Sequence, residues 1–240
     1  MNSKIQNRIE KNEMMLSSIV NTYFLADQNQ KLFGQLLDNP DLLARWDGSY
    51  AASGANSIRF SLYMYVLSEM RAILFDTHKK VASIHNVFKS LEDESFLNQL
   101  RKWFCDTSQK EILSFDGDLS EDTKDYIRAE DSKLKATWFD QLLEQATTNY
   151  EVLLTSEIGS RVNNARNKMI SHKEFQSADG SGRRVFEAND FGLVYSDAKD
   201  IIEMSHDIIF PLYSLITKSH FDSEHSMNHH KIVAEEFWAK

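Results

Sequence analysis

Apolar residues recur at nearly helical spacing through most of this chain. In residues 3–37 they return every few positions, with charged and amide side chains between them. This period is typical of an amphipathic helix. Asn39-Pro40 ends the pattern, because a proline disfavours helical geometry in the residue before it. We therefore predict one or two helices over residues 3–37, then a short turn over residues 42–46 and a loop at residues 47–49.

The most apolar stretch is residues 56–75, NSIRFSLYMYVLSEMRAILF. Its apolar residues cover nearly the whole circumference of a helix, which predicts a central helix buried on several sides. Asn56 or Ser57 is suited to cap its first turn. A polar break over residues 76–80 separates it from two amphipathic helices that we predict over residues 81–91 and 96–104.

The second half of the chain continues the helical pattern. After a loop over residues 112–121, Ser120 is suited to start a helix over residues 122–150, and the pattern continues in helix over 151–173. Residues 177–190 have the composition of a loop, and its flanks, 184–186 and 193–195, are predicted to pair as a short hairpin. Ser196-Asp197 is predicted to cap a last long helix, 197–218. The tail after Ser219 is polar until residues 232–238, which predict one more short helix.

These patterns predict one α-helical domain over residues 1–240. Only 8 glycines and 2 prolines occur, which suits long helices and suits a β fold with many turns poorly. Neither an internal repeat nor an inter-domain linker is visible. Within the domain we expect an N-terminal helical arm over residues 1–40, a bundle core over 54–218 and a polar tail over 219–240.

The charge and the cysteine content narrow the function classes. The net charge is −9, so the chain lacks the global basic footprint of a duplex DNA binder, although a local positive site remains compatible with it. Cys105 is the single cysteine, which excludes a disulfide within the chain and favours a reducing compartment. The N-terminal residues lack the apolar segment of a secretory signal, and no apolar run approaches the roughly 20 residues that span a membrane. We therefore expect a cytoplasmic protein without membrane contact.

The candidate chemistry lies in the sequence RNKMISH, residues 166–172. His172 can move a proton near neutral pH. Arg166 can hold the charge that builds on a phosphoryl group in its transition state. Together they are the side chains needed to cut a phosphodiester without a metal. The spacing also arises by chance in many helices, where it would be a solvated face whose basic residues favour the helix dipole.

A helical wheel places other basic residues around His172. Each residue advances about 100°, so Arg166 and His172 lie about 120° apart, and Lys168, Ala165 and Arg161 share the face of His172. We expect this basic stripe to contact substrate, with Ala165 leaving room for a phosphate or a partner backbone. Two copies related by a twofold axis would bring two histidines into one cleft.

Further positive charge flanks the motif. Lys173 follows His172 directly, and we count it with Lys168 and Arg161 as a candidate substrate-binding residue. Arg183 and Arg184 lie in the loop-like segment after the motif. They are candidate RNA contacts there, or else part of a solvated loop.

The sequence RNKMISH resembles the signature of the HEPN superfamily, in which an arginine and a polar residue precede a histidine. Its Arg-Asn-Lys opening, and the hydrophobic and small residues just before the histidine, look most like the abortive-infection AbiU-type branch. SLYMYVLSEMRAILFD, followed by SIHNVFKSL, is similar to that branch's buried helix ending in an acid. LVYSDAKDIIEMSHDIIFPLY resembles the helix after the motif, so that the resemblance covers about residues 20–218.

The resemblance implies an all-α fold, an antiparallel helical bundle of HEPN type with additional helices, and a homodimer formed through the motif helix. Many members of the superfamily are metal-independent ribonucleases that act as toxins or defence effectors. By this resemblance His172 would be the general acid/base that activates a ribose 2′-OH. Arg166 would steady the phosphorane, and Asn167 would orient Arg166 or the substrate.

This mechanism would use neither a cofactor nor a metal. It would leave a 2′,3′-cyclic phosphate and a 5′-OH end. RNA would be the substrate and DNA would be inert, because the nucleophile is the 2′-OH.

One departure concerns a neutralising partner protein. A toxin–antitoxin group in the superfamily carries a tyrosine two residues after the histidine, which a partner nucleotidyltransferase modifies. Glu174 stands at that position here, so this style of neutralisation is in doubt. Some members lack activity, which leaves a non-catalytic helical HEPN module that binds RNA or a protein partner as the alternative. A third interpretation is an unrelated helical scaffold with a fortuitous motif.

The polar tail holds a second possible site. It contains His220, His225, His229 and His230, and His225 and His229 have the i,i+4 spacing of two imidazoles on one helix face. No cysteine lies near them. We therefore favour a polar tail over a metal site and predict no metal.

Overall fold

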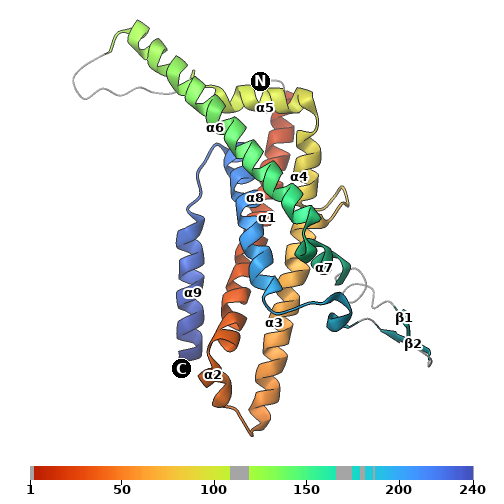
Figure 1. Ribbon diagram of the computed structural model, residues 1–240. Helices are drawn as coiled ribbons and strands as arrows, with labels where there is room; N and C mark the ends of the chain where they lie inside the picture. Colours follow the sequence, from red (N-terminus) through yellow and green to blue (C-terminus); the bar gives the residue numbers. More distant parts are fainter. Residues whose placement is uncertain (1–2, 109–118, 166–174, 179–181, 186, 240) are drawn as a thin grey trace.

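The computed structural model describes residues 3–108, 119–165, 175–178, 182–185 and 187–239 (Figure 1). Its helices are α1 (Ser3–Asp38), α2 (Pro40–Ala44), α3 (Tyr50–Phe75), α4 (Ile84–Leu91), α5 (Glu94–Cys105), α6 (Glu121–Thr155), α7 (Glu157–Ala165), α8 (Asp197–Thr217) and α9 (Ser223–Ala239). Strands β1 (Phe175–Ala178) and β2 (Gly182–Val185) and the 3₁₀ helix η2 (Ala188–Phe191) lie between α7 and α8.

Helix α1 runs through the centre of the bundle. It packs against α3, α8 and α9 and also contacts α4 and α5. Its buried side chains include Ile9, Leu16, Ile19, Tyr23 and Phe33, all of which belong to the hydrophobic core. The prediction of a helix over residues 3–37 is confirmed, but the prediction of an N-terminal arm is wrong. The apolar residues of α1 point to several neighbours, so the helix is a central member of the bundle.

The long helices lie side by side with alternating directions (Figure 1). Helix α1 runs antiparallel to both α3 and α8, and α9 runs antiparallel to α8 along the other side of α1. Helix α6 crosses α8 obliquely, and α5 lies across the end of the bundle that holds the N-terminus. Within the described residues, no helix combines the length and the apolar character needed to cross a bilayer.

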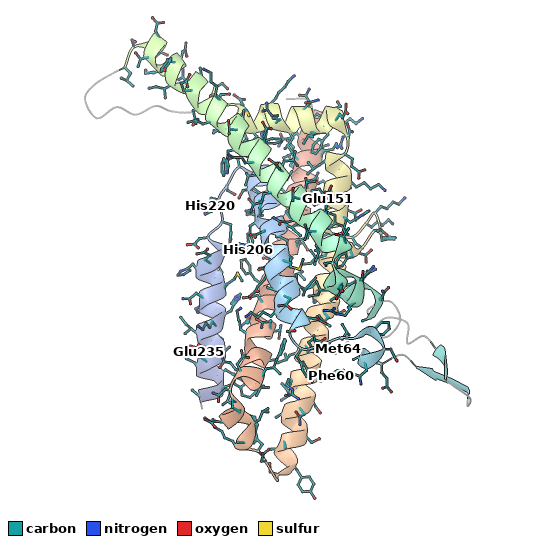
Figure 2. All side chains as sticks on the ribbon, in the orientation of Figure 1. Phe60, Met64, Glu151, His206, His220 and Glu235 are labelled. Atoms are coloured by element: carbon teal, nitrogen blue, oxygen red, sulfur yellow. The ribbon has the colours of Figure 1, made fainter. Side chains whose placement is uncertain are left out.

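Helix α3 is buried mainly in its second half, and Ala55 is its one buried residue before Tyr63. Ser49 rather than Asn56 or Ser57 occupies the N-cap position, so the helix begins earlier than predicted. Tyr63 and Met70 are buried, whereas Ile58 and Phe60 are about half exposed, at 50% and 46%. The first turns project beyond the rest of the bundle (Figures 1 and 2). The prediction of burial on several sides is therefore wrong for these turns. Their apolar side chains lie beyond the ends of the helices that would have covered them.

The segment between α7 and α8 differs from the prediction. Residues 182–185 pair with Phe175–Ala178 in an antiparallel hairpin, with Gln176 opposite Arg184 and Ser177 opposite Arg183. The predicted partner, residues 193–195, instead leads from η2 into α8. A partner joined by a short connection costs less chain entropy than a more distant one, and this favours the pairing with residues 175–178. Arg183 and Arg184 accordingly lie in a strand and not in a loop.

The residues predicted as a polar tail form α9, which packs along α1. Its buried residues are Ser223 and Ala234, so apolar burial contributes little to its docking. Polar and aromatic contacts hold it in place. The Trp238 indole N–H donates to the Leu32 carbonyl over 2.9 Å, and the Trp238 ring meets Trp46 edge-on.

The strongest contact of α9 is with a buried acid in α1. Asp27 is fully buried, and its Oδ2 lies 2.8 Å from Nδ1 of His230. The Lys31 ammonium lies 3.5 Å from the other carboxylate oxygen. A carboxylate taken out of water needs such partners, because an unpaired buried charge is costly. The i,i+4 spacing noted in the tail concerned His225 and His229, whereas the histidine that contacts Asp27 is His230.

We predict that His230→Ala lowers the free energy of unfolding by about 2 kcal/mol, because Asp27 then stays buried without its hydrogen-bond partner. Chemical denaturation followed by circular dichroism measures this loss. His225→Ala, at an exposed position of the same helix, is the matched control and should change stability little. Equal effects of the two substitutions would contradict the role given to the Asp27–His230 contact.

Candidate active site at the end of α7

The predicted motif follows directly after α7, which ends at Ala165. Arg166, Asn167, Lys168, His172 and Lys173 lie outside the described residues. The described elements on either side of the motif are α7 and β1. The surroundings of the site are therefore described from α7 and from the helices that contact its last turns, which we call the frame of the site. The helix predicted over residues 151–173 is interrupted at Ser156, which separates α6 from α7.

A tight backbone turn sets the start of α7. The Ser156 hydroxyl donates to the Leu153 carbonyl over 2.7 Å and accepts from the Gly159 N–H over 3.0 Å. A Cβ on Gly159 would collide with the backbone oxygen of Leu153. Glycine is therefore required where α7 passes this close to the end of α6.

The core holds one face of α7. Ile158, Val162 and Ala165 are buried, at the i, i+4, i+7 spacing of a single helical face. Ser160 and Asn164 on other faces are exposed. Ala165 thus packs inside its own bundle, so the expectation that a phosphate or partner backbone approaches there is wrong.

Arg161 joins α7 to the start of α8. Its guanidinium lies 2.6 Å from Oδ1 of Asp197, which is fully buried, and 3.5 Å from Glu157. The other oxygen of Asp197 accepts from the Val194 N–H over 2.9 Å. Asp197 is the first residue of α8, where the helix dipole favours a negative charge. The hydrogen bond to Asp197 raises the pKa of Arg161 further above its usual value.

Arg161, which we predicted to bind substrate, therefore already binds the buried carboxylate of Asp197. An arginine already paired with a buried carboxylate is held in place, and its free donors are fewer than the helical wheel implied. The sequence offered no sign of this pair, because the two residues lie far apart along the chain.

Arg71 belongs to no predicted motif, and it joins α7 to the end of α3. Its Nε donates to Oδ1 of Asn163 over 3.1 Å, and its Nη1 lies 3.3 Å from Oδ2 of Asp76. Asp76 is the acid that ends the apolar helix, and Asn163 lies two residues before Ala165. The only sequence signal for this link was an arginine within an otherwise apolar stretch that ends in an acid.

The end of α3 is also anchored to α6 and to the approach of α8. The Tyr150 hydroxyl donates to the Leu74 carbonyl over 3.2 Å, and burial raises the pKa of Tyr150 to about 12. The Tyr63 hydroxyl donates to the Val194 carbonyl over 3.0 Å, and burial raises the pKa of Tyr63 as well. Both phenols therefore stay neutral and act as hydrogen-bond donors that position the backbone.

Comparison with known proteins identifies the family. The model of the HEPN family AbiU2 matches residues 9–237, nearly the whole chain. The chain belongs to the AbiU2 family of HEPN proteins. Neither the curated proteins nor the solved structures include a match. The AbiU2 assignment confirms the predicted recognition, and the helical architecture agrees with the predicted HEPN-type fold.

The assignment makes this chain an abortive-infection-related HEPN domain. The matched region includes α7 and also residues 166–172, which carry the predicted motif. Among the described residues, which include all four tail histidines, no group of three or more His, Cys, Asp or Glu side chains is suited to hold a metal ion.

We predict that Gly159→Ala lowers the free energy of unfolding by about 2 kcal/mol, since the new methyl group must displace backbone. Gly54→Ala is the matched control. Gly54 lies in α3 with open space around it, and alanine there should stabilise the helix by roughly 0.5–1 kcal/mol. Thermal or urea unfolding of the two variants gives the comparison, and a neutral Gly159→Ala would show that the turn relaxes easily.

We predict that Arg161→Ala costs about 3 kcal/mol of stability, because it leaves the carboxylate of Asp197 buried without its charged partner. Arg101→Ala is the control. Arg101 makes an equally short 2.6 Å contact with Asp140, but both side chains are largely exposed, so its loss should cost under about 1 kcal/mol. A double-mutant cycle with Asp197→Asn measures the coupling. A coupling energy near zero would show that the Arg161–Asp197 contact does not stabilise the fold, and would leave substrate binding as the role of Arg161.

Proposed function

We propose that this AbiU2-family chain is a HEPN-type endoribonuclease that acts as a toxin or phage-defence effector in the cytoplasm. The observation that carries the proposal is the position of the Arg166–His172 motif. It directly follows α7, the helix whose last turns are held by Arg71 and Arg161, in a chain that belongs to this family.

The proposed chemistry uses side chains and the substrate's own hydroxyl. His172 accepts the proton of a ribose 2′-OH, and the 2′ oxygen attacks the adjacent phosphorus. The P–O5′ bond breaks as the new P–O2′ bond forms, which yields a 2′,3′-cyclic phosphate and a 5′-OH end. Arg166 neutralises the charge on the phosphorane, and Asn167 orients Arg166 or the substrate.

A homodimer would supply the second proton transfer. The departing 5′ oxygen needs an acid, and a twofold axis would place the second copy's histidine in the same cleft. The buried face of α7 is already occupied by its own bundle. The dimer contact would therefore use the exposed side of α7, which includes Ser160 and Asn164, together with the motif residues.

The second candidate is a non-catalytic HEPN module that binds RNA or a protein partner. The engagement of Arg161 with the buried Asp197 favours it, because one of the expected substrate contacts has a structural role. A neutralising partner protein is compatible with both candidate functions. Glu174 in the place of a modifiable tyrosine favours neutralisation by binding over modification of that position.

We predict that the wild-type protein cleaves a mixed RNA pool in EDTA and leaves cyclic phosphate ends. His172→Ala should reduce the rate about 100-fold or more, as expected for the loss of a general acid/base. Arg166→Ala should have a similar effect through lost charge stabilisation. Mass spectrometry of the product ends and a substrate with 2′-deoxyribose, which should be inert, complete the measurement.

Two substitutions serve as controls in this assay. His225→Ala and Arg101→Ala alter the same residue types in other helices, at an exposed and a partly exposed position, and should leave the rate unchanged. Sedimentation velocity on the same samples reports the oligomeric state. Cleavage that survives both motif substitutions, or no cleavage by the wild type, would move the assignment to the binding module.

A further inference from the structure

Two adjoining hollows form one groove between the first half of α1 and the connection from α3 to α4. One, of about 250 Å³, is lined by Arg8, Lys11, Asn12, Met15, Lys79, Asn86, Lys89 and Ser90. The other, of about 270 Å³, is lined by Lys11, Met14, Met15, Lys79, Lys80, Val81 and Ala82. Lys11, Met15 and Lys79 belong to both, so the two hollows are continuous. We call this the α1–α4 groove.

The charge of the groove is opposite to that of the whole chain. Five basic side chains and no carboxylate line it, whereas the chain carries a net charge of −9. Arg8 is engaged by Asp93 at 2.6 Å. Lys11, Lys79, Lys80 and Lys89 are exposed, and the ion pairs of the described residues include none of the four.

The helical geometry of α1 places Lys11 and its acidic sequence neighbours at different angles around the helix axis. At about 100° per residue, Lys11 and Met15 lie on one face, Glu13 lies on the opposite side of the helix, and Glu10 lies about 100° round from Lys11. Neither of these acidic residues is among the residues that line the groove. Partial burial, together with repulsion from Glu10, raises the pKa of Glu13.

The loop that carries Lys79 and Lys80 is held in one shape. The Asn86 amide donates to the carbonyls of His78 and Val81, over 3.0 and 2.9 Å. The Ser83 hydroxyl donates to the Asp76 carbonyl over 2.6 Å. A loop fixed in this way presents its cations without first paying the entropy of ordering.

The groove is connected to the frame of the proposed active site. The loop leaves α3 at Asp76, which Arg71 links to Asn163 in the last turns of α7. Figure 1 shows this connection leaving α3 close to α7. The positively charged groove is therefore linked to α7, the helix that ends directly before the motif.

We propose that the α1–α4 groove binds the phosphodiester backbone of single-stranded RNA. This inference rests on the proposed ribonuclease function, because that function supplies the strand. Lysines neutralise phosphates without reading bases. The groove has methionine, valine and alanine as its apolar lining and no aromatic ring, so it offers no platform on which bases would stack. Binding should accordingly be strongly salt-dependent and nearly independent of sequence.

The test compares two variants of equal charge in a His172→Ala background, where cleavage cannot interfere with binding. The groove variant carries Lys11→Gln, Lys79→Gln, Lys80→Gln and Lys89→Gln. The control variant carries Lys124→Gln, Lys133→Gln, Lys199→Gln and Lys231→Gln, four lysines that pair with carboxylates elsewhere. Fluorescence anisotropy with labelled homopolymeric single-stranded RNA, at several salt concentrations, gives Kd and the salt slope.

We expect the groove variant to raise Kd about tenfold or more and to reduce the salt slope by about 3, since each phosphate contact on a single strand contributes about 0.7. The control variant should bind like its parent. In the cleaving protein the groove substitutions should raise KM and leave kcat unchanged. Circular dichroism checks folding, and the loop pair Lys79→Gln/Lys80→Gln provides a milder variant with the same expected direction.

The proposal would be overturned by equal losses in the two variants, by unchanged binding in the groove variant, or by failure of the parent protein to bind RNA. Loss of binding to anionic lipid vesicles, with RNA binding intact, would likewise overturn it and assign the groove to a membrane surface. If RNA binding depends on the groove but no variant or wild type cleaves RNA, the groove stands and the ribonuclease proposal fails.

Discussion

The contact between Arg161 and the buried Asp197 is the constraint on which the arrangement around the motif depends. A carboxylate buried away from water needs partners that stabilise its charge. Asp197 has the Arg161 guanidinium, the Val194 N–H and its position in the first turn of α8. The same contact fixes the direction of α7 against α8. Arg71 adds a second link, from α3 through Asn163. The residues before the motif are therefore oriented by polar links to two other helices and by their own buried apolar face.

This frame separates positioning from chemistry. Arg71 and Arg161 hold α7, and Arg166 and His172 remain the candidates for acting on a phosphate. An acidic chain can still handle RNA if its positive charge is concentrated where the strand lies, because electrostatic attraction in salt acts over only about 8–10 Å. The motif and the α1–α4 groove concentrate basic residues in this way, and neither Glu10 nor Glu13 lines the groove.

The helices were largely predictable from the sequence. The spacing of apolar residues identified α1 and α8 closely, and Ser120 caps α6 as expected, accepting from the Thr123 N–H. Three predictions failed for a common reason. The arm, the polar tail and the hairpin partner all depend on which segments meet in space, and local periodicity does not carry this information. In α9, for instance, few residues are buried, so the pattern looked like a solvated tail.

By itself, the sequence determined the helical class, the candidate chemistry of Arg166 and His172 and the AbiU-type resemblance, because these depend on local spacing and residue type. Only the tertiary structure decided that α1 is central, that Ala165 is buried and that Arg161 pairs with Asp197. It also brought Lys11 from α1 beside Lys79, Lys80 and Lys89. Such contacts join residues distant in the chain, and they form only where packing offsets the entropy of closing the intervening loops.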